Sequence, residues 1–121
     1  MHNDAVLRGR RLLVVEDDYM VATDVAQGLA DHGAEIVGPV GSVQEALALI
    51  AAEPRIDGAV LDINLRNDKV YPVAEALRAR NVPFVFTTGY DAWTVPEAFA
   101  EVRRLDKPVD IRALVESISG Q

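Results

Sequence analysis

The chain has 121 residues; half are hydrophobic, none is cysteine, and 12 basic against 19 acidic residues give a formal net charge of −7. This length suits one domain, and the lack of cysteine excludes disulfides, iron–sulfur clusters and thiolate zinc sites. The acidic balance argues against partners bound through nucleic-acid phosphates or an anionic membrane surface, and is compatible with divalent cations. With no apolar run near the roughly 20 residues of a membrane span and no signal-peptide pattern, a cytoplasmic location is expected.

The first half of the chain alternates short apolar runs with amphipathic helical segments. In chain order it holds a strand-like run at 12–15, a helical face at 21–29, a short strand at 36–37 and a helical face at 43–50. Gly33 is predicted to follow the end of the first helix. Ser42 and Glu45 form a capping box that starts the second helix, and Pro54 ends it.

The second half continues this alternation to the end of the chain. It holds a strand at 59–61, a helical face at 70–77, a strand at 84–86, a short helix at 94–99, an edge-like strand at 102–105 and a helix at 111–118. Five strand–helix units predict an α/β fold with a parallel sheet covered on both faces, and the flavodoxin-like order 2-1-3-4-5 is one of few allowed topologies. Residues 1–9 are expected to be a flexible tail, and residues 10–121 the domain.

Polar residues follow four of the predicted strands at their carboxyl ends, where ligands bind in open α/β sheets. These residues are Glu16, Asp17 and Asp18 after the first strand, Asp62 after the third, Thr87, Thr88 and Gly89 after the fourth, and Lys107 after the fifth. An acidic first turn would repel a nucleotide or flavin phosphate, which excludes Rossmann and flavin sites. The acids instead suit a hard cation such as Mg²⁺. Two carboxylates ~4 Å apart repel by about 4 kcal/mol at a dielectric near 20, so a cation, Lys107 or a raised carboxyl pKa must offset the repulsion.

The four motifs together resemble a response-regulator receiver domain, from about Arg10 to the end of the chain. They are the segments 12–18, 60–62, 86–89 and 106–108. The resemblance implies that Asp62 is the phosphoacceptor, that Glu16, Asp17, Asp62 and the backbone carbonyl of Asn64 hold Mg²⁺ or Mn²⁺, and that Thr88 and Lys107 bind phosphoryl oxygens. It also implies a cis peptide bond between Lys107 and Pro108.

The sequence departs from the usual receiver at two places. Residues 63–69, after Asp62, lack the usual Pro and Asp-Gly turn, and Arg104 stands where a switch aromatic is usual. The segments 86–90 and 70–73 resemble a subgroup of stand-alone receivers with a Phe-x-Thr-Gly signature, some of which act in general stress-response signalling. Tyr90, Trp93 and Arg104 are assigned to a switch or partner surface, and a one-residue shift of the alignment would exchange Thr88 with Thr87.

The resemblance implies a single-domain response regulator of a two-component system or phosphorelay. A sensor histidine kinase or histidine phosphotransfer protein would transfer a phosphoryl group to Asp62, which would switch binding to a downstream protein partner or drain phosphate from the relay. Such a protein is a signalling switch and not an enzyme beyond its own phosphorylation and dephosphorylation. It is expected to be a monomer or weak dimer with no direct contact to nucleic acid or membrane.

Two alternatives stay open from the residues alone. The first is a degenerate receiver that binds proteins without being phosphorylated. The second is a Mg²⁺-dependent nuclease or topoisomerase-primase-like domain, which also places acids after its first and third strands. This second class would need another acid near Asp62, where the sequence has Asn64, and a basic surface for nucleic acid.

Overall fold

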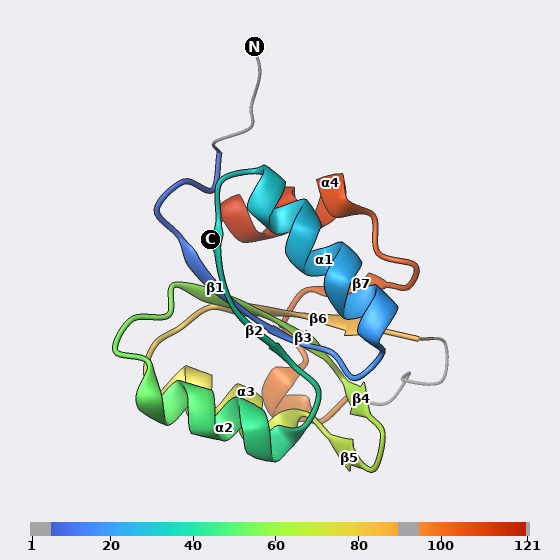
Figure 1. Cartoon of the computed structure of the whole chain (residues 1–121). Helices are drawn as coiled ribbons and strands as arrows, with labels where there is room; N and C mark the ends of the chain where they lie inside the picture. Colours follow the sequence, from blue (N-terminus) through green and yellow to red (C-terminus); the bar gives the residue numbers. More distant parts are fainter. Residues whose placement is uncertain (1–5, 90–94, 121) are drawn as a thin grey trace.

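The computed structural model describes residues 6–89 and 95–120, and its centre is a five-stranded parallel sheet (Figure 1). The strands are β1 (Arg11–Val15), β2 (Glu35–Val40), β3 (Gly58–Asp62), β6 (Phe84–Thr88) and β7 (Arg104–Asp106). Their spatial order is β2-β1-β3-β6-β7. This order confirms the predicted flavodoxin-like fold, because the two strands missing from the series form a separate hairpin.

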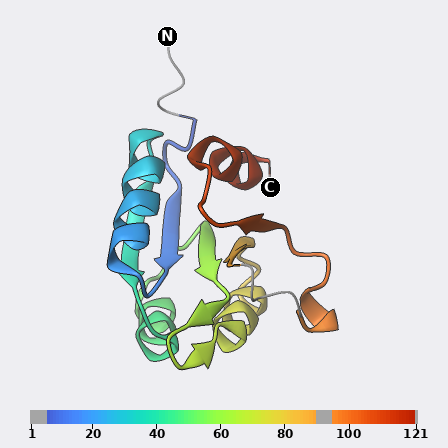
Figure 2. The same cartoon turned by 90° about the vertical axis from the view of Figure 1, so that its right-hand side faces the viewer.

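Helices cover both faces of the sheet, as Figures 1 and 2 show. They are α1 (Tyr19–Asp31), α2 (Val43–Ala52), α3 (Tyr71–Ala79) and α4 (Ile111–Ser119). Side chains that alternate along each strand supply two core clusters: Leu12 and Val14 pack with residues of α1 and α4, and Leu13 and Val15 pack with residues of α2 and α3. The continuous apolar runs in the sequence therefore reflect strands buried on both faces.

The predicted helix ends are confirmed where the caps can be checked. Ser42 Oγ accepts a 3.1 Å hydrogen bond from the backbone N–H of Glu45, and Glu45 in turn accepts one of 3.2 Å from the N–H of Gly41. Gly33 follows the end of α1 with a φ of 101°, in the left-handed region that favours glycine. The helix α2 ends at Ala52, two residues before Pro54.

Three expectations about the chain are corrected. Within the described part of residues 94–99 there is only a 3-10 turn, η1 (Glu97–Phe99), because Pro96 starts it and the segment is too short for an α-helix. The strand expected at 102–105 is β7, which starts two residues later and ends one residue later. Residues 6–9 are not a loose tail, since Leu7 is fully buried in the cluster beneath α1 and its N–H donates a 2.8 Å hydrogen bond to the carbonyl of His32.

A two-stranded antiparallel hairpin, β4 (Asn64–Leu65) and β5 (Asp68–Lys69), follows β3 directly. No pattern in the sequence predicts this hairpin. Figure 2 shows the arrowhead of β1, in blue, directed toward the end of the sheet at which this hairpin lies. The hairpin therefore flanks the carboxyl ends of the strands, where the candidate site residues stand.

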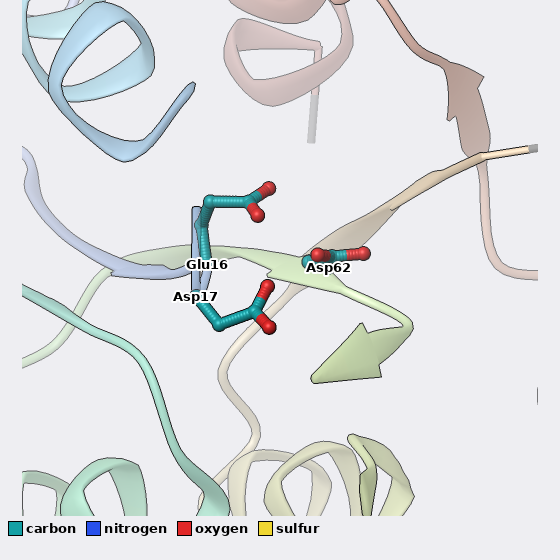
Figure 3. Close-up of side chains that lie close together, drawn as sticks. All are labelled: Glu16, Asp17 and Asp62. Atoms are coloured by element: carbon teal, nitrogen blue, oxygen red, sulfur yellow. The ribbon is translucent and has the colours of Figure 1, made fainter. Parts of the chain in front are cut away.

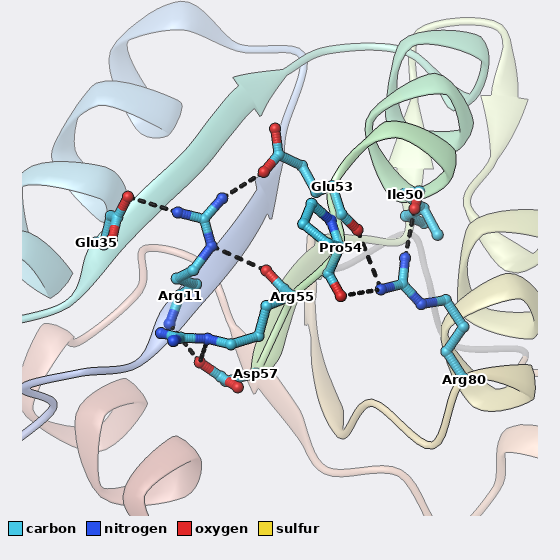
Figure 4. A network of polar contacts seen from close by, with 8 residues as sticks. All are labelled: Arg11, Glu35, Ile50, Glu53, Pro54, Arg55, Asp57 and Arg80. Atoms are coloured by element: carbon cyan, nitrogen blue, oxygen red, sulfur yellow. Dashed lines mark hydrogen bonds and ion pairs between the residues drawn. The ribbon is translucent and has the colours of Figure 1, made fainter.

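The opposite end of the sheet carries a network of arginines and acids (Figure 4). Arg11 donates to Glu35 at 2.5 Å, to Glu53, and to the carbonyl of Arg55 at 2.9 Å. Arg80 donates to three carbonyls at the end of α2, those of Ile50, Glu53 and Pro54. This network links β1, β2 and the two helices of one face at the amino ends of the strands.

Candidate functional site

Three carboxylates meet at the carboxyl ends of β1 and β3 (Figure 3). Glu16, Asp17 and Asp62 each contribute one oxygen to a group whose atoms lie within 4.8 Å of one another. Glu16 and Asp62 are buried and Asp17 is partly exposed, which gives the group one open side. Three oxygen donors of this kind, on the open side of a buried strand end, fit a hard divalent cation.

Lys107 joins two of these acids. Its Nζ lies 2.9 Å from Glu16 Oε1 and 2.9 Å from Asp62 Oδ2. The residue follows β7 directly, and its backbone N–H donates a 2.9 Å hydrogen bond to the carbonyl of Thr88 on β6. The Lys107–Pro108 peptide bond is cis, which confirms the sequence prediction.

Burial and charge change the pKa values of this pair of groups. Burial raises the pKa of Glu16 to about 7; hydrogen bonds from Lys107 and from the N–H of Asp18 oppose this, and the nearby Asp62 adds to it. Burial alone would lower the pKa of Lys107, but its contacts with Glu16 and Asp62 together raise it above the ordinary value. The lysine is therefore charged at neutral pH, and the Glu16 carboxyl keeps its proton to a higher pH than an exposed glutamate does.

The third residue of the acidic run, Asp18, has a different position. It is the N-cap of α1, and its Oδ1 accepts hydrogen bonds of 3.0 and 3.2 Å from the N–H groups of Met20 and Val21. This is the ordinary stabilisation of a helix N-terminus. The structure thus divides the acidic run into two residues at the cluster and one helix cap.

The hairpin brings further groups to the cluster. The Asn64 N–H donates to Asp62 Oδ1 at 3.2 Å, and the Asn64 side chain accepts from Lys69 Nζ. The Arg66 N–H donates to Asp17 Oδ2 at 2.8 Å. Sequence reasoning named Asn64 but missed Arg66, because the contact depends on a hairpin between two-residue strands that carry no alternating apolar pattern.

Two threonines follow one another at the end of β6. Thr87 is the register partner of Asp62, and Thr88 is the partner of Asp106 on β7. Both are buried. The Thr88 hydroxyl donates to the carbonyl of Gly89 at 2.7 Å. The register thus places Thr87 beside Asp62 and Thr88 one residue closer to the open end, and the role of Thr88 stays a prediction.

The residues assigned to a switch surface are placed only in part. Tyr90 and Trp93 lie outside the described residues. Arg104 is exposed on β7, with Phe86 as its register partner. Tyr71, at the start of α3, stacks on Phe99 with ring centroids 5.6 Å apart and makes an edge contact with Phe86 at 5.9 Å. Burial raises the pKa of Tyr71, and the charge of Arg104 opposes this rise.

Comparison with known proteins places the chain in a family, although no protein-family model matches it. It is 31% identical over 113 residues to the transcriptional regulatory protein PdtaR of Mycobacterium tuberculosis, an alignment with 90% of this chain and 55% of PdtaR. It is 37% identical to SdrG of Sphingomonas melonis Fr1, with a TM-score of 0.75 over 91% of this chain and 93% of that one. SdrG has also been solved in a BeF₃-activated conformation, to which this chain is 36% identical, with a TM-score of 0.75 over 90% of this chain and 92% of that one.

A further similar solved structure is described as a response regulator receiver domain protein. The CheY-like response regulator receiver domain protein of Methanospirillum hungatei JF-1 is 27% identical, with a TM-score of 0.77 over 92% of this chain and 91% of that one. The chain spans about half the length of PdtaR and nearly the full length of the two solved relatives. Among the described helices, none has the length and apolar character needed to cross a membrane. By sequence and by fold, the chain belongs to the response-regulator receiver domains of two-component systems.

Proposed function

We propose that this receiver domain accepts a phosphoryl group on Asp62 from a phosphohistidine of a sensor histidine kinase or a phosphotransfer protein. One observation carries the proposal. Asp62 is 3% exposed at the end of β3, with a lysine ammonium 2.9 Å from one of its oxygens and two further carboxylates beside it. Burying an acid beside other carboxylates costs free energy that a helix-capping role would not require. Clusters of charged groups with shifted pKa values are concentrated at functional sites.

The chemistry is a phosphoryl transfer between two side chains. An Asp62 oxygen attacks phosphorus, the P–N bond breaks, and its electron pair goes to the imidazole nitrogen, which takes up a proton. Lys107 would move from the carboxylates to a phosphoryl oxygen, because the Asp62 carboxylate loses its negative charge when it becomes an acyl phosphate, whereas the phosphoryl oxygens are anionic. The Asn64 N–H holds the other Asp62 oxygen in place during the attack.

Glu16, Asp17 and Asp62 would hold Mg²⁺ or Mn²⁺, with the carbonyl of Asn64 as a further ligand. When bound, the cation supplies positive charge that lets an anionic carboxylate approach an anionic phosphoryl group. The donor set fits this role because it consists only of oxygens, of which two belong to buried acids.

Phosphorylation would then be reported through Thr88 and Lys107, which meet between β6 and β7. We propose that the Thr88 hydroxyl leaves the carbonyl of Gly89 and binds a phosphoryl oxygen, which would change the end of β6. A downstream protein partner would read that change, or the domain would drain phosphate from a relay. The protein would act as a signalling switch in the cytoplasm, as a monomer or weak dimer.

Intact-mass measurement tests the phosphoacceptor. The protein is incubated with Mg²⁺ and acetyl phosphate, and wild type is expected to gain one phosphoryl group that Asp62→Asn does not gain. Asp31→Asn, at an exposed acid at the end of α1, is the matched control and should gain it as wild type does. If wild type gains nothing from acetyl phosphate or from its kinase, the domain is a phosphorylation-independent interaction module.

The threonine assignment has its own test. BeF₃⁻ with Mg²⁺ is added to the ¹⁵N-labelled protein, and amide signals of β6 and β7 are followed by NMR. Thr88→Ala is expected to keep phosphoryl gain on Asp62 but lose the changes in β7. If Thr87→Ala loses them instead, the alignment is shifted by one residue and Thr87 is the reporting residue.

A further inference from the structure

Arg66 brings two separate groups to one oxygen of the acidic cluster. Its backbone N–H donates a 2.8 Å hydrogen bond to Asp17 Oδ2, and its guanidinium Nε lies 4.0 Å from the same oxygen. Three-quarters of the Arg66 side chain is exposed, so the guanidinium is on the open side of the cluster. The backbone N–H and the guanidinium of Arg66 thus both act on Asp17, which is proposed to hold a cation.

The position of Arg66 is fixed by the core and not by this contact alone. The N–H of Ile63 donates to the carbonyl of Thr87 at 3.0 Å, and the N–H of Val70 donates to the carbonyl of Ile63 at 3.0 Å, which closes the loop between them. Ile63, Val70 and Leu65 are all buried in the cluster beneath α2 and α3. The hairpin turn at Arg66 is therefore held against Asp17 by a packed base.

The two groups affect a cation at Asp17 in opposite directions. A backbone hydrogen bond fixes the orientation of the carboxylate, so that less rotational freedom is lost when a cation binds. The guanidinium places a positive charge beside the same oxygen, where it repels the divalent cation and competes with that cation for the Asp17 carboxylate. The first effect tightens cation binding, and the second weakens it.

We propose that Arg66 is a positioning residue that sets the divalent-cation affinity of the acidic cluster: its N–H pre-orients Asp17, and its guanidinium acts as a competing counter-ion. The inference rests on the proposed function, in which these acids hold Mg²⁺. It makes the β4–β5 hairpin a regulatory part of the site.

Two substitutions at this position separate the two effects. Arg66→Ala removes the guanidinium and keeps the N–H. Arg66→Pro removes both. Arg66 has no positive φ and is the second residue of a four-residue turn, a position at which Pro is favoured. Circular dichroism and urea denaturation in EDTA check that both variants keep the wild-type fold.

Calorimetric titration with MgCl₂ measures the outcome on the full chain. Arg66→Ala is expected to bind Mg²⁺ about two- to fivefold more tightly than wild type, the range of an exposed ion pair. Arg66→Pro is expected to bind about three- to tenfold more weakly than Arg66→Ala, the range of a typical intramolecular hydrogen bond. In ~1 M NaCl the affinity difference between Arg66→Ala and wild type should fall below twofold, because the Debye length is then about 3 Å. The difference between Arg66→Pro and Arg66→Ala should persist.

Arg8→Ala is the matched control for net charge, since Arg8 is exposed and lies at the far end of the sheet. It should bind Mg²⁺ as wild type does. If wild type binds Mg²⁺ and Arg66→Ala binds it equally or more weakly, or if Arg66→Pro equals Arg66→Ala, the inference is overturned while the proposed function stands. If wild type itself binds no Mg²⁺, the proposed function fails as well.

Discussion

The two ends of the five-stranded sheet carry acids in very different surroundings. At the amino ends of the strands, Glu35, Glu53 and Asp57 each accept hydrogen bonds from arginines. At the carboxyl ends, Glu16 and Asp62 share the ammonium of one lysine, and they are nearly inaccessible to water. The acids at the first end are paired with arginines, which suits a stabilising role. The two buried acids at the second end share one positive charge, and the cation proposed to bind there would relieve their repulsion.

The largest effect is expected from removing the shared lysine. Lys107→Met leaves Glu16 and Asp62 buried without their cation, and we expect it to lower the free energy of unfolding by about 3 kcal/mol in EDTA at pH 8. Saturating Mg²⁺ should restore much of the loss, since a cation would replace the ammonium charge. Urea denaturation with and without Mg²⁺ measures both values. An equal loss under the two conditions would mean that these acids bind no cation.

Glu16 makes the carboxyl end sensitive to pH. Its pKa is raised from 4.5 to about 7 on folding, so between these values the folded chain holds a proton that the unfolded chain has released. Stability from this group is therefore complete below pH 4.5 and declines as the pH rises to about 7, by at most about 3 kcal/mol. Urea denaturation in EDTA across pH 5 to 8 measures the decline. Glu16→Gln, which cannot titrate, is expected to show a flatter profile; a profile as steep as that of wild type would assign the effect to another group.

The amino end should respond to substitution without any link to cations. Arg11→Met keeps much of the apolar stem but loses the contacts with Glu35, Glu53 and the carbonyl of Arg55. With most of the arginine side chain shielded from water, we expect a loss of about 2 kcal/mol. Unlike the loss in Lys107→Met, this one should be the same with and without Mg²⁺, and phosphoryl gain on Asp62 should be unchanged. Recovery of Arg11→Met by Mg²⁺ would show that the two ends are coupled.

The sequence predicted the strands and the acids at their ends because both are local signals. Buried parallel strands appear as unbroken apolar runs, and the topology of the fold brings their carboxyl ends together without further information. Glu16, Asp17, Asp62 and Lys107 could therefore be placed in one site before their distances were known. The register also bears on a choice that the sequence left open, since it places Thr87 and not Thr88 directly beside Asp62.

The parts that the sequence did not predict depend on contacts between distant segments. The hairpin after Asp62 consists of strands of two residues, and one of them, Asp68–Lys69, is exposed and charged. Leu7 ends a run of only three apolar residues between polar ones, and only the fold shows that it packs beneath α1. The partners of Arg11 are 24 and more residues away along the chain. Such pairings have no periodicity that a sequence pattern could reveal.

The smallest expected effect concerns how Arg80 closes the amino end. Its guanidinium donates to the carbonyls of Ile50, Glu53 and Pro54, which the end of α2 leaves without helical partners. Arg80→Ala is expected to lower the free energy of unfolding by about 1 kcal/mol, measured by urea denaturation. Arg80→Lys keeps the charge but not the planar fork that reaches several carbonyls at once. If Arg80→Lys recovers the full stability, the effect comes from the positive charge at the helix end. Recovery of half or less assigns the effect to the hydrogen-bond geometry of the guanidinium. The carboxyl end differs in this respect, because there the ammonium of Lys107 contacts two acids without a planar fork.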